Sequence, residues 1–404
     1  AGELIIKGEL LVWTDVIVNG VLTISGNARL EGKLTEVNGT MTIQEDASAF
    51  CSCLGGKGSI VNNGALSVGT LMIGTTVTGE GKYESIDGNR SMIVSKMEDL
   101  KTALAMANDP ACDYTITIQR GAVDEDAPDF VLSESITIPD NMTLDIRRTE
   151  NSGFRGFVVA QGVTLEMLGT LHVETDEGMT IAGTVLAGRA ATESEQAHGC
   201  CLVANAVMVQ EGGKLVNNGY VQVYRLEDTM GVALYSAETA ANGTLVVRGT
   251  MENRERIDIN DGTIIVDSTG KLTNGGNMHF NGSSGVLAVN GQMENQTGAQ
   301  VNCNSLQYSG SAFTNAGSIG CVSLQHSGGS FTNTGDLDAG TLDIADDSTI
   351  TNEGHISYED CDTLERIENT DTGDIQWYKV VTTIKELREL LARTGEGNVT
   401  VPAI

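Results

Sequence analysis

The chain has 404 residues, of which 49 are glycine, 4 are proline and only 4% are aromatic. A globular enzyme of this length would divide into several domains with bulky side chains in their cores, so this composition indicates a thin, mostly aliphatic core. The 54 acidic and 24 basic residues give a formal net charge of -30, which disfavours nucleic acid and anionic membranes as partners. No apolar run approaches the roughly 18 residues of a membrane helix, so no membrane insertion is expected.

The N-terminal sequence Ala1-Gly2-Glu3-Leu4 lacks the basic start and the apolar block of a signal peptide. We therefore expect an extracellular or cell-wall-attached protein whose signal peptide has been removed, or a piece of a longer chain. The eight cysteines contain no C-x-x-C pair and no zinc-site spacing. Free or partly buried thiols are expected, and disulfide bonds remain the alternative for an extracellular chain.

Residues 1–88 contain short apolar alternations that recur every 18 or 19 residues. Alternation at period 2 predicts a strand with one buried and one exposed face. We expect this segment to hold the final coils of a β-helix module. The recurring pairs are Leu4/Ile6, Leu22/Ile24, Met41/Ile43 and Ile60/Asn62, with corners at Val18-Asn19-Gly20 and Val37-Asn38-Gly39.

Residues 94–105 break the strand pattern and align without gaps with residues 381–392, at an offset of 287. In the first segment Met97, Leu100 and Leu104 fall on one face of a short helix, and the second segment repeats this spacing. The open end of a solenoid exposes unpaired backbone, so a helix that covers it is expected. We predict capping helices near 95–108 and 383–393.

The two helices divide the chain into three parts. Residues 1–88 are predicted to be the final coils of one module, and 89–378 a complete module with an N-terminal capping helix. Residues 379–404 are predicted to be a capping helix and the start of a further module, or a C-terminal cap. We expect a chain excised from a longer tandem array; the alternative is that the second helix only caps the C-terminus.

Two polar excursions interrupt the middle of the chain, at 188–199 and 225–242. Excursions from a regular solenoid are where binding surfaces are built, and two that leave one face of adjacent coils would form a cleft. The alternative is a pair of tolerated surface loops. The candidate binding residues are Arg189, Glu193, Glu195, His198, Arg225, Glu227, Asp228 and Tyr235.

Residues 251–352 carry the strongest repeat, an apolar-x-Asn motif usually followed by glycine. Two further alternating pairs lie between successive copies, so each repeat of about 18 to 21 residues is predicted to hold three short strands. Inward histidine His326 is expected at the end of a core strand, hydrogen-bonded locally. The repeated asparagines are Asn253, Asn274, Asn295, Asn315, Asn333 and Asn352.

Three strands per repeat keep equivalent environments only if the chain coils and each strand stacks on its counterpart one turn later. The predicted fold is therefore all-β, a parallel β-helix of fourteen to sixteen coils and about 70 Å. We expect the repeated asparagines to form a structural ladder of amide hydrogen bonds at a corner that tolerates left-handed backbone, with the nearby glycines at positive φ.

The repeated apolar-x-Asn-x-Gly corners and the helix at 94–105 that precedes the segment 133–144 resemble the right-handed parallel β-helix modules of bacterial cell-surface proteins. That group shares its scaffold with pectate lyases. The resemblance implies a scaffold and no particular activity.

No catalytic residues and no metal ligands are predicted. A pectate-lyase-like site would need clustered carboxylates beside a basic residue, whereas acidic pairs such as Asp258/Asp261 and Asp336/Asp338 are expected to be solvated corners. No cofactor is expected; no motif indicates calcium, although the acidic residues leave it open.

We expect a non-catalytic extracellular module with an adhesin-like or spacer role, whose partner is a glycan or a host or cell-surface protein. The alternative is a protein that binds or degrades polysaccharide through an outer sheet face or the 188–242 loops. A phage tail-fibre component would normally need trimerisation segments, which are not visible in the sequence.

Overall fold

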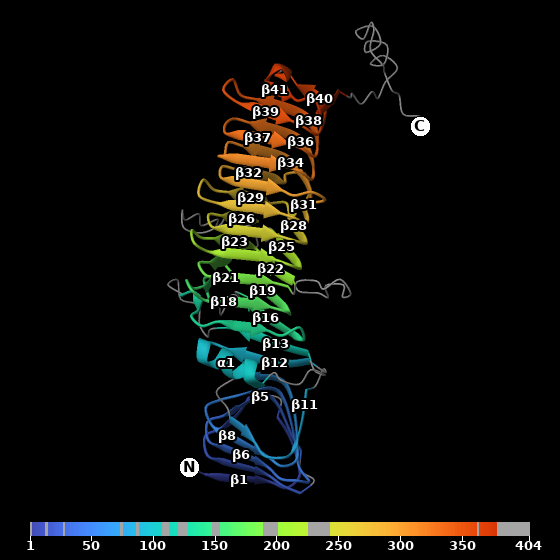
Figure 1. The fold of residues 1–404 in the computed structure, drawn as a ribbon. Helices are drawn as coiled ribbons and strands as arrows, with labels where there is room; N and C mark the ends of the chain where they lie inside the picture. The colour runs from blue at the N-terminus through green and yellow to red at the C-terminus, as the bar shows by residue number, and fades with distance from the viewer. Residues whose placement is uncertain are drawn as a thin grey trace, which may run out of the picture.

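The computed structural model describes residues 2–12, 15–26, 29–72, 76–85, 89–106, 113–119, 128–147, 154–188, 201–224, 243–361 and 363–377. These residues form parallel strands that coil for about 15 turns. Figure 1 shows one elongated stack with β1 near one end and β41 near the other. The predicted all-β parallel β-helix is confirmed; the coils in the middle of the column have three short strands, and in coils toward both ends two of these merge into one longer strand. At about 4.8 Å per turn the stack is about 70 Å long.

The strands before residue 95 form an N-terminal stack. One wall is a five-stranded sheet of β1 (Glu3–Ile6), β4 (Val21–Ile24), β6 (Thr40–Ile43), β8 (Ser59–Asn62) and β10 (Thr76–Thr78). The other two walls share long strands that turn a corner, so that β2 and β3 both pair with β5, and β11 and β12 both pair with β9. Their strands are β2 (Glu9–Val12), β3 (Val16–Val18), β5 (Arg29–Val37), β7 (Ser48–Gly55), β9 (Ala65–Met72), β11 (Lys82–Ser85) and β12 (Asn89–Val94).

The strands after residue 112 form a C-terminal stack with walls that we name A, B and C. Wall A is β15 (Ile136–Ile138), β18 (Thr164–Met167), β21 (Thr184–Ala187), β24 (Lys214–Asn217), β27 (Thr250–Asn253), β30 (Lys271–Asn274), β33 (Gln292–Asn295), β35 (Ala312–Asn315), β37 (Ser330–Asn333), β39 (Thr349–Asn352) and β41 (Ile367–Asn369). Wall B starts with β13 (Asp113–Ile118), β16 (Met142–Arg147), β19 (Thr170–Glu174), β22 (Cys201–Ala204), β25 (Tyr220–Tyr224), β28 (Arg256–Asn260) and β31 (Asn277–Asn281). Wall C starts with β14 (Phe130–Leu132), β17 (Phe157–Val159), β20 (Met179–Ile181), β23 (Ala206–Val209), β26 (Thr244–Val247), β29 (Thr263–Val266) and β32 (Val286–Val289).

Walls B and C join toward the C-terminal end because the later strands run through both. In β34, Val301 pairs with Met278 of wall B and Leu306 pairs with Leu287 of wall C. At the corner between walls B and C, the two short strands are therefore replaced by one continuous strand. These strands are β34 (Gln300–Tyr308), β36 (Ser318–His326), β38 (Asp336–Ile344) and β40 (His355–Cys361), and β42 (Asp374–Trp377) extends wall B.

The two stacks meet at β12, where the walls change partners. On one side β12 pairs with the second half of β9, through Met92 and Leu71. On the other side it pairs with β13, the first strand of wall B, through Met92 and Ile116. The third wall position of the N-terminal stack thus continues as wall B of the C-terminal stack. This shift lies next to the predicted boundary at residue 88, although the division into modules itself stays a prediction.

The helix α1 (Met97–Met106) follows β12 directly and packs against β12 and β13. It lies within the predicted range 95–108 and presents the expected apolar face, with Leu100 and Ala103 fully buried and Leu104 partly buried. Figure 1 shows α1 at the junction of the two stacks, so it covers the core partway along the column and not at an end. The second predicted helix, 383–393, lies outside the described residues.

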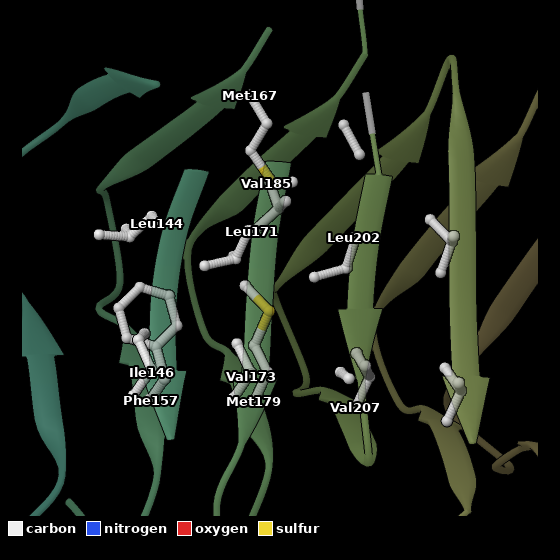
Figure 2. Packing of buried hydrophobic residues seen from close by; sticks show 14 of the residues in the cluster. Leu144, Ile146, Phe157, Met167, Leu171, Val173, Met179, Val185, Leu202 and Val207 are labelled. Carbon is white, nitrogen blue, oxygen red and sulfur yellow. The ribbon is translucent and has the colours of Figure 1, made fainter. Parts of the chain in front are cut away.

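The core is a narrow axial column of inward side chains stacked at strand spacing. Figure 2 shows Leu144, Leu171 and Leu202 in one row on successive strands, with Ile146 and Val173 in the next. All five are fully buried. Each such side chain contributes roughly 1.5–3 kcal/mol through removal of its apolar surface from water, which explains how few aromatic residues suffice.

From β24 onward, each strand of wall A ends with an inward asparagine, and these side chains form a continuous ladder. Each Nδ2 donates to Oδ1 of the next asparagine, over 2.7–2.8 Å at every step. The six asparagines identified from the sequence belong to it, and Asn217 and Asn369 extend it at the two ends. Every member from Asn217 to Asn352 is at most 1% exposed.

The ladder asparagines are not in left-handed backbone as expected, because Asp261 is the one non-glycine residue with positive φ in the part of the chain described. The glycines that follow at Gly317, Gly335 and Gly354 also lack positive φ. They stack directly, and a Cβ added to one would overlap the carbonyl oxygen of the coil before it. Glycine is therefore required here by close backbone approach, which corrects the expectation of a φ-based role.

Two further predictions concern single residues of the core. His326 is 1% exposed at the end of β36, and its Nε2 lies 3.2 Å from the carbonyl oxygen of Thr349, so it bonds locally as predicted. Its ring stacks on Tyr308 with centroids 5.0 Å apart. The cysteines described, Cys51, Cys53, Cys303, Cys321 and Cys361, are free thiols.

Candidate functional site

The eight candidate binding residues lie outside the described residues, within 189–200 and 225–242. The structure does describe where these segments attach. Cys201 begins β22 and Tyr224 ends β25, and β22 and β25 are paired neighbours in wall B. The segments therefore join opposite ends of adjacent strands in wall B. The outer face of wall B beside these two attachment points carries two clusters of polar and aromatic side chains.

One part of this face is a histidine cluster, made of Asp145, His172, Glu174 and Tyr224. His172 Nδ1 lies 3.5 Å from Asp145 Oδ1, and His172 Nε2 lies 3.5 Å from Glu174 Oε1. The Tyr224 hydroxyl donates to Glu174 and lies 3.2 Å from His172 Nε2. The imidazole is thus held between two carboxylates and a phenol, so its ring plane is fixed.

The other part is an arginine cluster, made of Tyr220, Arg256 and Asp258. Arg256 donates from Nε and Nη2 to the two Asp258 oxygens, each over 2.9 Å, and the Tyr220 hydroxyl donates to Asp258 over 2.8 Å. The guanidinium carbon lies 5.7 Å from the Tyr220 ring centroid. Asp258 therefore orients both a guanidinium and an aromatic ring.

The sequence analysis expected Asp258 to be a solvated corner residue, and this prediction was wrong. Its side chain is 6% exposed in the middle of β28, not solvated at a corner, while the Arg256 side chain remains 56% exposed. Hydrogen bonding to Asp258 raises the pKa of the Arg256 guanidinium above its already high usual value, so Arg256 stays charged. In the motif Arg256-Ile257-Asp258, the alternation of a strand places Arg256 and Asp258 on the same face. This alternation was the signal in the sequence from which their pairing could have been predicted.

The two clusters share one surface. Asp145, His172, Val203, Gln222 and Asp258 are register partners on the successive strands β16, β19, β22, β25 and β28. Four strand intervals separate the first from the last, a span of about 19 Å along the column axis. Val203 and Gln222 form the floor between the clusters.

Other polar pairs on wall B are smaller. His355 Nδ1 lies 3.1 Å from Asp374 Oδ2, and Ser357 donates to Asp338 over 3.0 Å. Within the described ranges, no group of three or more His, Cys, Asp or Glu side chains is arranged to hold a metal ion. No helix among the described residues is long and apolar enough to span a membrane.

Comparisons with known proteins do not add to this picture. Neither the protein-family models, nor the curated proteins, nor the solved structures gave a match to this chain. The arguments about function below therefore rest on the geometry of the column and of its outer faces.

Proposed function

We propose that this chain is a non-catalytic β-solenoid module of a bacterial surface protein, extracellular or attached to the cell wall, with a spacer or adhesin-like role. The observation that carries the proposal is the uninterrupted stack. Every strand of wall A from β24 to β41 pairs in register with the next, and the asparagine ladder runs through the same eight strands.

A stack of this kind supports a spacer role for a physical reason. Backbone hydrogen bonds and the amide ladder both run parallel to the column axis, so bending the column requires stretching many bonds together. The structure gains length with each coil. The resemblance to bacterial surface modules adds support at the level of the scaffold.

A direct test is to change the length of the column by one coil. Deleting residues 316–333 removes one whole turn, because Asn315 and Asn333 are register partners on wall A. Small-angle scattering should show a folded column shortened by about 4.8 Å. In a cell-surface display assay, the reach of a tag fused to the distal end should shorten with it, and a compact particle or an unfolded deletion variant would refute the spacer role.

A catalytic role is tested separately by incubating the protein with neutral and acidic polysaccharides, with and without calcium. We expect no new reducing ends and no unsaturated products. Turnover of any of these polymers would show that the chain is an enzyme, whatever the outcome of the length experiment.

A second function, glycan binding, is favoured by the two clusters on wall B, which are more than a spacer requires. Carboxylates, a guanidinium and tyrosine rings on one face are typical of sites that recognise sugar hydroxyls.

A further inference from the structure

We propose that the outer face of wall B between β16 and β28 binds a neutral, hydroxyl-rich oligosaccharide lying along the column axis. This inference does not depend on the spacer role, since a rod can carry a site or lack one. It names the residues and the ligand chemistry that the general possibility of glycan binding leaves open.

The first argument is that the arginine cluster is pre-organised. An outward position on a β-solenoid wall is ordinarily exposed, yet the Asp258 side chain is more than nine-tenths buried. It is held by three hydrogen bonds, two from Arg256 and one from Tyr220. Arg256 keeps Nη1 free of the Asp258 pair and is more than half exposed, so a fixed donor faces outward beside an aromatic ring. Because this donor is already held in place, ligand binding would cost little side-chain conformational entropy.

The second argument is the mixture of donors and acceptors in the histidine cluster. Sugar hydroxyls both donate and accept, and they are matched by groups that also do both within a small area. His172 and its three partners supply this mixture, because Asp145, Glu174 and Tyr224 each have an oxygen within 3.5 Å of a His172 ring nitrogen. All four lie at the surface but are partly covered, which keeps their geometry fixed.

The charge balance favours a neutral ligand. Asp258 already neutralises Arg256, so the guanidinium does not act as an isolated anion site. The whole chain carries a net charge of -30, which repels polyanions such as uronic acid polymers. Both carboxylates of the histidine cluster are engaged by His172 or Tyr224, so a basic peptide would have to break existing contacts.

The shape of the surface favours an oligosaccharide over a single sugar. The two clusters together span about 19 Å from Asp145 to Asp258, and they meet on β25, where Gln222 lies between Tyr220 and Tyr224. A chain of sugars along the axis could contact both clusters at once, which would increase affinity through multiple weak contacts.

The test uses the full chain on an array of immobilised neutral oligosaccharides, N-acetylated amino-sugar oligosaccharides, oligogalacturonides and Lys/Arg-rich peptides. We expect binding to neutral or N-acetylated oligosaccharides, rising with length, followed by calorimetry on the best binder. Tyr224→Ala and Arg256→Gln should each weaken binding by at least about tenfold, as expected for hot-spot side chains.

Arg254→Gln is the matched control, because Arg254 is 55% exposed and paired with Glu252 over 2.8 Å but lies next to wall A. The Arg254→Gln protein should bind the oligosaccharide as tightly as the native protein. Since loss of Arg256 leaves a buried carboxylate, Gln222→Trp provides an independent variant that covers the floor without adding a charge that could pair with the neighbouring Asp258. The inference is overturned if no oligosaccharide binds, if peptides or oligogalacturonides are the ligands, or if folded Tyr224→Ala and Gln222→Trp proteins bind normally.

Discussion

Asn315 donates both of its amide hydrogens upward along the column, one to Oδ1 of Asn333 over 2.7 Å and one to the carbonyl oxygen of Asp336 over 2.9 Å. Its own Oδ1 accepts from Asn295 over 2.7 Å. The side chain thus has hydrogen-bond partners for both amide hydrogens and for its oxygen in the buried core, where hydrogen bonds are stronger and unpaired groups are costly. This relationship repeats at each rung and makes the ladder a directional chain of donors.

Removal of one central rung should therefore destabilise the column strongly. Asn315→Ala leaves a donor of Asn295 and the acceptor of Asn333 without partners, so we expect a loss of about 2–4 kcal/mol in the free energy of unfolding. Asn315→Asp should be at least as harmful, because a carboxylate cannot donate to Asn333. Urea denaturation followed by circular dichroism measures both.

Two controls separate the ladder from general effects. Thr314→Ala changes the neighbouring outward residue and should stay within about 0.5 kcal/mol of the native protein. Asn369→Ala removes the exposed terminal rung, where water can replace the lost partner, and should be much milder than Asn315→Ala. Equal effects at Asn315 and Asn369 would argue against a cooperative buried ladder.

The glycine stack makes a steric prediction. In Gly335→Ala the new Cβ would overlap the carbonyl oxygen of Gly317, and this oxygen belongs to hydrogen-bonded backbone that cannot easily move aside. We expect a loss of at least about 1–3 kcal/mol from overpacking. Gly328→Ala is the control, because the nearest atom to its Cβ would be 3.5 Å away and its φ is not positive. A mild effect at Gly335 would show that the coils can separate locally.

The sequence predicted those features that depend on local periodicity and failed on those that depend on which coils become neighbours. The spacing of apolar-x-Asn motifs was sufficient to place Asn253 to Asn352 on one ladder, since equal spacing implies equal wall position. Asp258 was misplaced because its burial depends on Tyr220, which lies 38 residues earlier. The contact between His172 and Tyr224 was missed for the same reason. These residues are 52 positions apart, and the irregular coils between them conceal which strands become neighbours.

The junction helix provides a further prediction. Leu100 of α1 is fully buried where the walls change partners, so Leu100→Ala should cost about 2–5 kcal/mol in the stability of the region around β12 and β13. Hydrogen exchange should show the loss first in β12, β13 and α1. Lys101→Ala removes only an exposed ion pair with Glu134 and should change little. Unchanged exchange in β12 and β13 would mean that α1 does not hold the junction together.

His326 should make the column sensitive to mild acid. Burial lowers the pKa of its imidazole below the usual value of 6.5, against the smaller opposing effect of its bond to the Thr349 carbonyl. The unfolded chain therefore binds the proton more readily than the folded one, so the stability is complete above about pH 6.5 and falls as the pH drops below it. A single site of this kind changes the free energy of unfolding by at most about 1.4 kcal/mol per pH unit.

Urea titrations at pH 5 and pH 7.5 measure this effect as a difference in the free energy of unfolding. The difference should be smaller in His326→Phe, which keeps the ring over Tyr308, than in the native protein. A native-like pH response in His326→Phe would assign the acid sensitivity to other groups.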